Sequence, residues 1–251
     1  MGESGDIVDA EYIDIEPKFE RWSWEKHFRN YLLMLAKKGD KGLESLKNYP
    51  SKVDLGPDIN EVLDRCRKET ETGDERYGLS GADADGFQLF VSQKFWKGNE
   101  EWFNGGLRKM VPGEVVYAAR VGASEKGLEV ILGDIHSHPW SMFEGMMMEL
   151  GIRDLHYFSA PDILGLLKLK DVFRMLVTGN QNLLIMKSVE TAATVKDLEM
   201  SGEEFENYWF DKVTGVSQNN WGATVNKKIC EAHRLVLYKG KRGKELHRIF
   251  P

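Results

Sequence analysis

The stretch GLEVILGDIHSHP, residues 127–139, does most to decide how this chain folds. Its first part is largely apolar, and a short apolar run bounded by glycine and proline is typical of a buried β-strand. Two histidines, His136 and His138, close the run. Residues two apart in extended backbone point to the same face of a sheet. We therefore expect both imidazoles to face the same side.

Working outward, further strands and separate helices are predicted around this stretch. Residues 86–93, 114–121, 174–178 and 182–189 have strand-like patterns, and residues 233–249 are typical of a hairpin. Helices are predicted at residues 19–38, from Pro57 to about residue 70, at 163–173 and at 195–212. Residues 39–56 have the composition of a connection. Hairpins mixed with separate helices favour an α+β fold over a doubly wound sheet.

The spacing of the two histidines suits a metal ion. Both imidazoles can reach one ion at the ~2.0–2.1 Å typical of zinc–nitrogen bonds. The alternative is a chance pair at the end of a strand that forms only local hydrogen bonds, and the pair alone leaves both interpretations open. The two cysteines, Cys66 and Cys230, form no Cys-x-x-Cys pair. A cysteine zinc knuckle, a dithiol redox site and a nucleoside deaminase half-site are therefore not expected.

A second polar signal, Ser159-Ala160-Pro161-Asp162, directly precedes an apolar helix. Ser-x-x-Asp at this place predicts a capping box with Ser159 as the N-cap residue. The same helix start would hold the carboxylate of Asp162 rigidly, which suits a third metal ligand. The capping role and the ligand role are compatible, so both are expected.

In the order in which they occur, these residues resemble the motif of a known family. His136-Ser137-His138-Pro139 followed by Ser159-x-x-Asp162 is similar to the JAMM (MPN+) zinc metalloprotease motif, Glu…His-x-His-Pro…Ser-x-x-Asp. The resemblance implies that His136, His138 and Asp162 bind Zn2+. It further implies that Ser159 stabilises a tetrahedral intermediate and that an upstream glutamate is the general acid/base.

Three glutamates are candidates for the general acid/base. Glu75 opens the segment ERYGLSG, which has the Glu-x-x-Gly-Leu-x-Gly form often found in the family after a first helix. We prefer Glu75 for this reason, although a solvated loop carboxylate is the alternative at this position. Glu114 and Glu129 compete with it, because each lies at or within a predicted strand near the histidines.

The resemblance also implies a fold and a division of the chain. The fold would be a JAB/MPN-like (cytidine-deaminase-like) mixed β-sheet flanked by helices, with extensions at both ends. The predicted segments are an acidic flexible tail at 1–18, an N-terminal helical extension at 19–56, the catalytic domain at 57–190, and a C-terminal helix and hairpin at 191–251.

The function implied is hydrolysis of an amide bond at or near the C-terminus of ubiquitin, a ubiquitin-like protein or their conjugates. In such enzymes an extended substrate tail can add as a strand beside the active site. The strands near residues 87–93 and 114–121 are candidates for that edge. The alternative is a non-catalytic MPN-type scaffold, against which the complete ligand set argues.

One departure from the family pattern lies between the ligands. Twenty residues separate His138 from Ser159, where the family usually has fewer than ten. The inserted piece is rich in methionine and contains His156, which we expect at the surface. It is either a lid or docking surface for substrate, since methionine packs against varied partners, or a short helix that buries its methionines on the core.

Composition excludes other classes of protein. The formal net charge of −6 argues against a broad surface for nucleic acid. No apolar run is long enough to span a bilayer, and the N-terminus MGESGDIVDAEYIDIEP lacks the apolar region of a secretory signal. We therefore expect a cytoplasmic protein without nucleic-acid or membrane partners.

Overall fold

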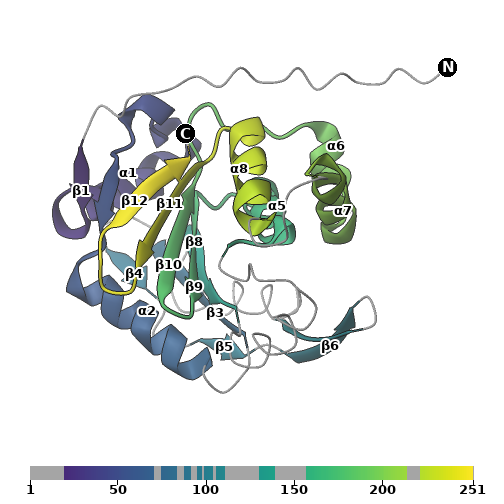
Figure 1. Ribbon diagram of the computed structural model, residues 1–251. Coiled ribbons are helices and arrows are strands. Elements are labelled where there is room, and N and C mark those ends of the chain that lie inside the picture. Colours follow the sequence, from purple (N-terminus) through teal and green to yellow (C-terminus); the bar gives the residue numbers. More distant parts are fainter. Residues whose placement is uncertain are drawn as a thin grey trace.

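A mixed β-sheet forms the centre of the protein (Figure 1). The computed structural model describes residues 20–70, 75–83, 88–91, 95–97, 99–103, 106–110, 130–138, 157–213 and 221–250. Among these residues the sheet has ten strands. Nine of them follow one another across the sheet in the order β1 (Arg21–Ser23), β2 (Lys52–Asp54), β12 (Leu246–Phe250), β11 (Val236–Lys241), β10 (Gln181–Met186), β9 (Phe173–Thr178), β8 (Val130–Ser137), β3 (Arg76–Ala82) and β4 (Leu89–Val91). The tenth, β5 (Trp96–Lys97), pairs with β3. A separate hairpin joins β6 (Asn99–Phe103) to β7 (Gly106–Met110).

Helices cover both faces of this sheet (Figure 1). On one face lie α1 (Arg29–Lys38) and α2 (Gly56–Thr70), and on the other lie α5 (Ala160–Lys168), α6 (Val195–Glu199), α7 (Gly202–Lys212) and α8 (Trp221–His233). A π-helical segment at Trp24–Phe28 leads into α1, and short 3-10 turns follow it at Gly39–Gly42 and Leu46–Asn48. The α+β class predicted from the sequence is confirmed.

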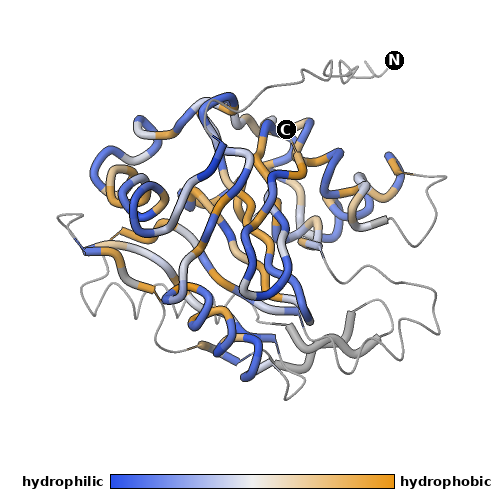
Figure 2. Tube along the Cα trace, turned by 60° about the vertical axis from the view of Figure 1, so that its left-hand side comes forward, coloured by the Kyte–Doolittle hydropathy of each residue, from blue (hydrophilic) through white to orange (hydrophobic). Residues whose placement is uncertain are grey.

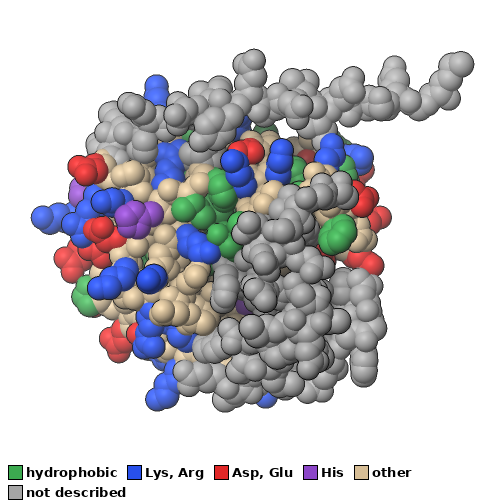
Figure 3. Space-filling view, in the orientation of Figure 1, with side chains coloured by type: hydrophobic (Ala, Val, Ile, Leu, Met, Phe, Trp, Pro, Cys, Tyr) green, Lys and Arg blue, Asp and Glu red, His purple; other side chains and the backbone are tan. Residues whose placement is uncertain are grey.

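Each face of the sheet has its own hydrophobic cluster, because side chains alternate along the strands. On β9, Met175 and Val177 pack in the α1/α2 cluster, whereas Leu176 between them packs in the α5/α7/α8 cluster. β10 alternates in the same way, with Leu184 on the first side and Ile185 on the second. Figure 2 shows the hydrophobic residues concentrated along these central strands, and Figure 3 shows Lys and Arg interspersed with Asp and Glu on one outer face.

The N-terminal part of the chain differs from the prediction. A helix was expected over 19–38, but residues 21–23 form β1, and helical structure begins at Trp24. β1 pairs in parallel with β2, which lies in the expected connection, and Trp22 stands opposite the buried Val53. Strands this short take their hydrogen bonds from distant partners, so a local pattern does not reveal them.

The C-terminal part agrees with the prediction for its strands and differs for its helices. β9, β10 and the β11–β12 hairpin confirm the predicted strands. The single helix expected over 195–212 is two helices, because Ser201 begins a new capping box with Glu204. α8 was not predicted at all. Strands from both ends of the chain join the sheet that carries the central strands, so the predicted boundaries at 57 and 190 do not separate sheets.

Two of the predicted strands are described only in part. β4 covers three residues of the expected 86–93 strand, and β8 begins three residues after the expected start at residue 127. The expected strand at 114–121 and most of the methionine-rich insertion, with His156, lie outside the described residues. Among the described helices, none is long and apolar enough to cross a membrane.

Candidate metal centre

The histidine pair lies where β8 ends, between β3 and β9. His136 stands opposite Tyr77 of β3 and opposite Leu176 of β9. Side-chain alternation turns His136 toward α5, whereas its neighbours Ile135 and Ser137 face α2. His138 follows the strand, and its backbone N–H donates to the carbonyl of Val177 (3.2 Å). The strand prediction for the pair is therefore confirmed.

Four of the predicted site residues meet at this strand end. Ligand atoms of Glu75, His136 and His138 lie within 4.8 Å of one another. The carboxylate of Asp162 contacts both imidazoles, with Oδ1 at 3.5 Å from Nε2 of His136 and Oδ2 at 3.3 Å from Nε2 of His138. Glu75 and Asp162, which are 87 positions apart in the chain, thus lie at the same strand end.

Glu75 is held next to the pair by a small hydrogen-bonded cluster on the opposite face of the sheet. The hydroxyl of Ser137 accepts the N–H of Arg76 (3.0 Å) and lies 2.5 Å from the hydroxyl of Thr70, the last residue of α2. Glu75 itself is only 9% exposed, so it is not the solvated loop carboxylate of the alternative interpretation. The competing Glu114 and Glu129 lie outside the described residues.

Asp162 is held by the N-terminus of α5, as the sequence predicts. Ser159 is the N-cap residue of a complete capping box: its hydroxyl accepts the N–H of Asp162 (3.2 Å), and its own N–H donates to Oδ2 of Asp162 (2.8 Å). The hydroxyl also donates to the same oxygen (2.6 Å). The cap thus orients the carboxylate of Asp162 with Oδ1 toward His136. The oxyanion role of Ser159 stays a prediction.

Two charged residues behind His136 were missed by the sequence analysis. Oδ1 of Asp134 lies 3.3 Å from Nδ1 of His136, and Oδ2 forms an ion pair with Nε of Arg174 at 2.9 Å. Arg174 also donates from Nη1 to the main-chain carbonyl of Asp162 (2.6 Å). The sequence contained a signal for Asp134, because it is a charged residue within an apolar strand. It lies two positions before His136 and therefore on the same face of the strand. No local signal marked Arg174.

An aromatic ring covers His136 from another side. The ring of Phe158 lies 5.8 Å from the imidazole, centroid to centroid, and is buried. Its carbonyl accepts a hydrogen bond from the side chain of Asn226 on α8 (2.7 Å). The helix that the sequence analysis missed therefore helps to enclose the site.

The local charges strongly perturb both ionisable partners. Burial acts to lower the pKa of His136, but the negative charge of Asp162 and hydrogen bonds to Asp134 and Asp162 raise it to about 10. Burial acts to raise the pKa of Asp162, but the adjacent histidines hold it well below its usual range. Glu75, Asp134 and Asp162 bring three carboxyl groups to the site, and carboxylates stabilise a nearby cation.

The surroundings of Nε2 of His136 also fit a metal ion. Nε2 of His136 is buried, and Oδ1 of Asp162 lies 3.5 Å away, too far for a strong hydrogen bond. Because the carboxylate of Asp134 can only accept, Nδ1 keeps its hydrogen, and Nε2 is the nitrogen that would bind a metal after losing its own. A buried nitrogen facing Glu75, His138 and Asp162 in this way is what a ligand to an ion requires.

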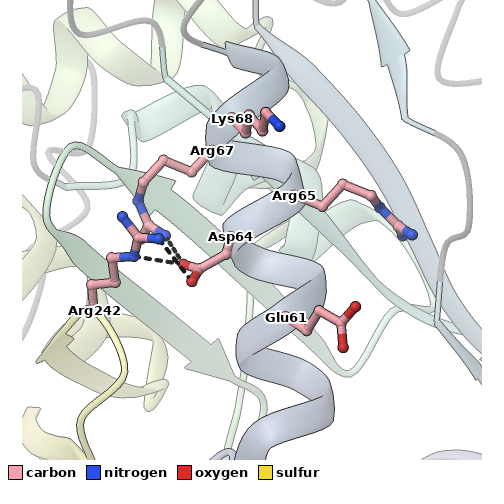
Figure 4. A pocket seen from close by; sticks show the side chains of 6 residues that line it. All are labelled: Glu61, Asp64, Arg65, Arg67, Lys68 and Arg242. Atoms are coloured by element: carbon pink, nitrogen blue, oxygen red, sulfur yellow. Dashed lines mark hydrogen bonds and ion pairs between the residues drawn. The ribbon is translucent and has the colours of Figure 1, made fainter.

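A second charged cluster lies on the α2 face of the sheet (Figure 4). It borders a recess of ≈ 540 Å³ lined by Glu61, Asp64, Arg65, Arg67, Lys68 and Arg242. Asp64 contacts Arg67 (2.5 Å) and Arg242 (2.9 Å). Arg67 also donates to the carbonyl of Gly179 (2.7 Å) and to Asn182 (2.6 Å). Asp64, Arg67 and Arg242 thus pair with one another, and the bonds of Arg67 to Gly179 and Asn182 fasten α2 to the strands.

Comparison with known proteins gives no match: no family model, no curated protein and no solved structure matches this chain. The resemblance to the JAMM motif therefore stays an expectation from the sequence.

Proposed function

We propose that this chain is a zinc-dependent peptidase or isopeptidase of the JAMM type. The proposed reaction is hydrolysis of an amide bond at or near the C-terminus of ubiquitin or a ubiquitin-like protein. One observation carries the proposal: Glu75, His136, His138 and Asp162 converge from three separate elements on one place. Three protein ligands with an open position and a nearby carboxylate are typical of catalytic rather than structural zinc.

Each residue has a role in this proposal that its surroundings support. His136, His138 and Asp162 hold the ion, which when bound would supply Lewis acidity and a water of lowered pKa. Glu75 accepts a proton from the attacking water and passes it to the leaving amine. Its low exposure and its place within 4.8 Å of the histidine nitrogens suit this task. Ser159, at the positive end of α5, would stabilise the developing oxyanion once its hydroxyl, which donates to Oδ2 of Asp162 in this structure, turns toward the substrate.

The sheet beside the site supports an extended substrate tail. Glu75 directly precedes β3, which pairs with β5 at Arg76 and Tyr77 and with β4 at Ser80–Ala82. β4 ends the path of described strands on that side. A peptide added to this edge parallel to β4 would have its C-terminal end on the side of the histidine pair.

The proposal is tested with purified protein loaded with zinc. The substrates are a ubiquitin C-terminal fluorogenic conjugate, an isopeptide-linked ubiquitin dimer and an unrelated peptide of the same length. His138→Ala should lose both zinc and cleavage. Glu75→Gln should retain zinc and lose at least ~100-fold in kcat, since a positioned acid/base contributes about 10²–10⁴-fold. Glu61→Gln, the same change on the outer surface of α2, is the matched control and should change neither.

The outcomes separate the proposal from its rivals. Wild type that binds zinc but cleaves none of these substrates would favour the scaffold alternative. Cleavage that survives Glu75→Gln would reject this glutamate as the acid/base, and Glu114→Gln and Glu129→Gln would then identify the correct one. Cleavage of the unrelated peptide at an equal rate would reject the ubiquitin-like substrate and leave a general peptidase.

A further inference from the structure

Asp134 and Arg174 form an ion pair directly behind the metal ligands. Asp134 is completely buried and Arg174 is 8% exposed. One carboxylate oxygen of Asp134 faces Nδ1 of His136, and the other faces Nε of Arg174 at 2.9 Å. The pair therefore bridges the neighbouring strands β8 and β9, and it lies on the α5 side of the sheet.

Arg174 also reaches the element that carries the third ligand. Its Nη1 donates to the carbonyl of Asp162 in the first turn of α5 (2.6 Å). The helix lies so close to the guanidinium that a Cβ at Gly165 would be 2.8 Å from Nη1 and 2.9 Å from Nη2. Any larger residue at this position would displace the arginine or the helix. The guanidinium is thus enclosed between the strand of His136 and the helix of Asp162.

We propose that Asp134 and Arg174 act as one positioning unit for the metal centre. Asp134 holds His136 with Nδ1 protonated and Nε2 directed at the ion. Arg174 holds α5 at a fixed separation from β8, so that Asp162 meets the two imidazoles. This inference rests on the proposed zinc site, but it concerns ligand geometry and does not depend on which substrate is cleaved.

The burial of the pair needs such a reason. A buried ion pair loses the hydration of both charges, and well-packed apolar residues in its place are often as stable or more so. The surroundings are apolar enough for that replacement, since Ile163, Leu166 and Leu176 are fully buried nearby in the same cluster. Yet both contacts of Arg174 lead to ligand-bearing elements. A carboxylate that orients a metal-bound histidine typically improves metal affinity 10- to 100-fold.

The test measures zinc affinity and coordination geometry in Asp134→Asn, Arg174→Lys and the double variant. Zinc affinity is measured by competition with a chromophoric chelator, and geometry by the visible d–d spectrum of the Co2+-loaded protein. Each single variant should bind zinc about 10- to 100-fold more weakly. Lysine keeps the charge but cannot make both directed contacts, so its cobalt spectrum should change as well. The double variant should lose little more zinc affinity than the single variant that binds zinc less tightly, because the two residues act as a unit.

The control is Arg67→Lys, which makes the same change at a buried arginine on the other face of the sheet. It should lower the melting temperature and leave zinc affinity and the cobalt spectrum unchanged. Should Arg174→Lys fail to fold, Asp134→Asn and Gly165→Ala decide the question in the same assays.

Zinc affinities within twofold of wild type, with unchanged cobalt spectra, would overturn the positioning role even if the enzyme cleaves its substrate. A wild type that binds no zinc would overturn both proposals. A wild type that binds zinc but cleaves no substrate would contradict the proposed function alone. The zinc affinities of the variants would still decide the positioning role.

Discussion

Two buried arginines, Arg67 and Arg174, face opposite sides of the same sheet and differ in what they join. Arg67 extends from α2 and donates to a turn, to Asn182 and to Asp64. Arg174 joins Asp134, next to His136, to the backbone of Asp162. One arginine fastens a helix to strand ends, and the other connects the parts of a site. Burial of an arginine therefore indicates a function only when its partners are considered.

The pKa values of the two arginines also shift in opposite directions. Burial lowers the pKa of Arg67, and the charge of Asp64 does not fully compensate. Burial acts on Arg174 in the same direction, but Asp134 and Asp162 more than compensate and raise its pKa. The α5 side of the sheet is thus the more negative of the two environments.

The largest expected effect comes from removing one carboxylate charge on each side. Asp162→Asn should weaken zinc binding at least ~100-fold and abolish hydrolysis, because a metal ligand is lost while the helix cap is largely kept. Asp64→Asn should leave zinc binding unchanged and lower the free energy of unfolding by about 1–2 kcal/mol, since Asp64 itself and its partner Arg242 are partly exposed. Chelator competition and urea unfolding measure the two quantities. Equal zinc affinity in both variants would erase the distinction between the two sides.

Removal of zinc should lower the melting temperature only where the histidine pair is intact. At 100 times its dissociation constant, zinc should stabilise the fold by about 2.7 kcal/mol. For a chain of this size that corresponds to a melting temperature about 5–10 °C higher with zinc than with a chelator. His138→Ala should show no such shift, and Arg67→Lys should show all of it. Differential scanning calorimetry decides, and a shift retained in His138→Ala would show that zinc binds elsewhere.

A smaller effect is expected from adding one methyl group on each side. Gly165→Ala should weaken zinc binding several-fold and lower the free energy of unfolding by about 1–3 kcal/mol, since its Cβ would lie 2.8 Å from Arg174. Gly42→Ala would meet Cδ2 of Leu35 and Cβ of Lys38 at 3.3 Å, a milder crowding than at Gly165, and should cost under about 1 kcal/mol. Zinc affinity should not change in Gly42→Ala. Urea unfolding and chelator competition measure both variants, and equal losses of zinc affinity would contradict a specific contact with Arg174.

The smallest change is expected at the two cysteines, one beside each hydrophobic cluster. Burial raises the pKa of Cys66 to about 12 and also raises that of Cys230. Neither thiol should react with a thiol reagent at pH 8 until the protein unfolds. A thiol whose folded pKa exceeds its unfolded value contributes stability below the unfolded pKa, near 9.0, and loses it as the pH rises toward 12. Labelling at different rates in dilute denaturant would show that the two sides unfold separately.

Some of the site could be predicted because its signals are local. The same-face direction of His136 and His138 follows from strand geometry, and the capping box of Ser159 and Asp162 follows from helix geometry. The choice of Glu75 depended on a resemblance, and its burial supports that choice. The three-residue strands β1 and β2 and the helix α8 were not predicted, because tertiary contacts rather than local pattern stabilise them.

By itself, the sequence determined which face of its own strand or helix each candidate residue takes. Backbone periodicity and capping act over only a few residues, so they can be recognised within a short segment. Only the tertiary structure decided that β8 lies between β3 and β9, which brings Glu75 to the histidines and places Arg174 behind them. Strand pairing depends on burial and hydrogen bonding across the whole sheet, and no short segment contains that information.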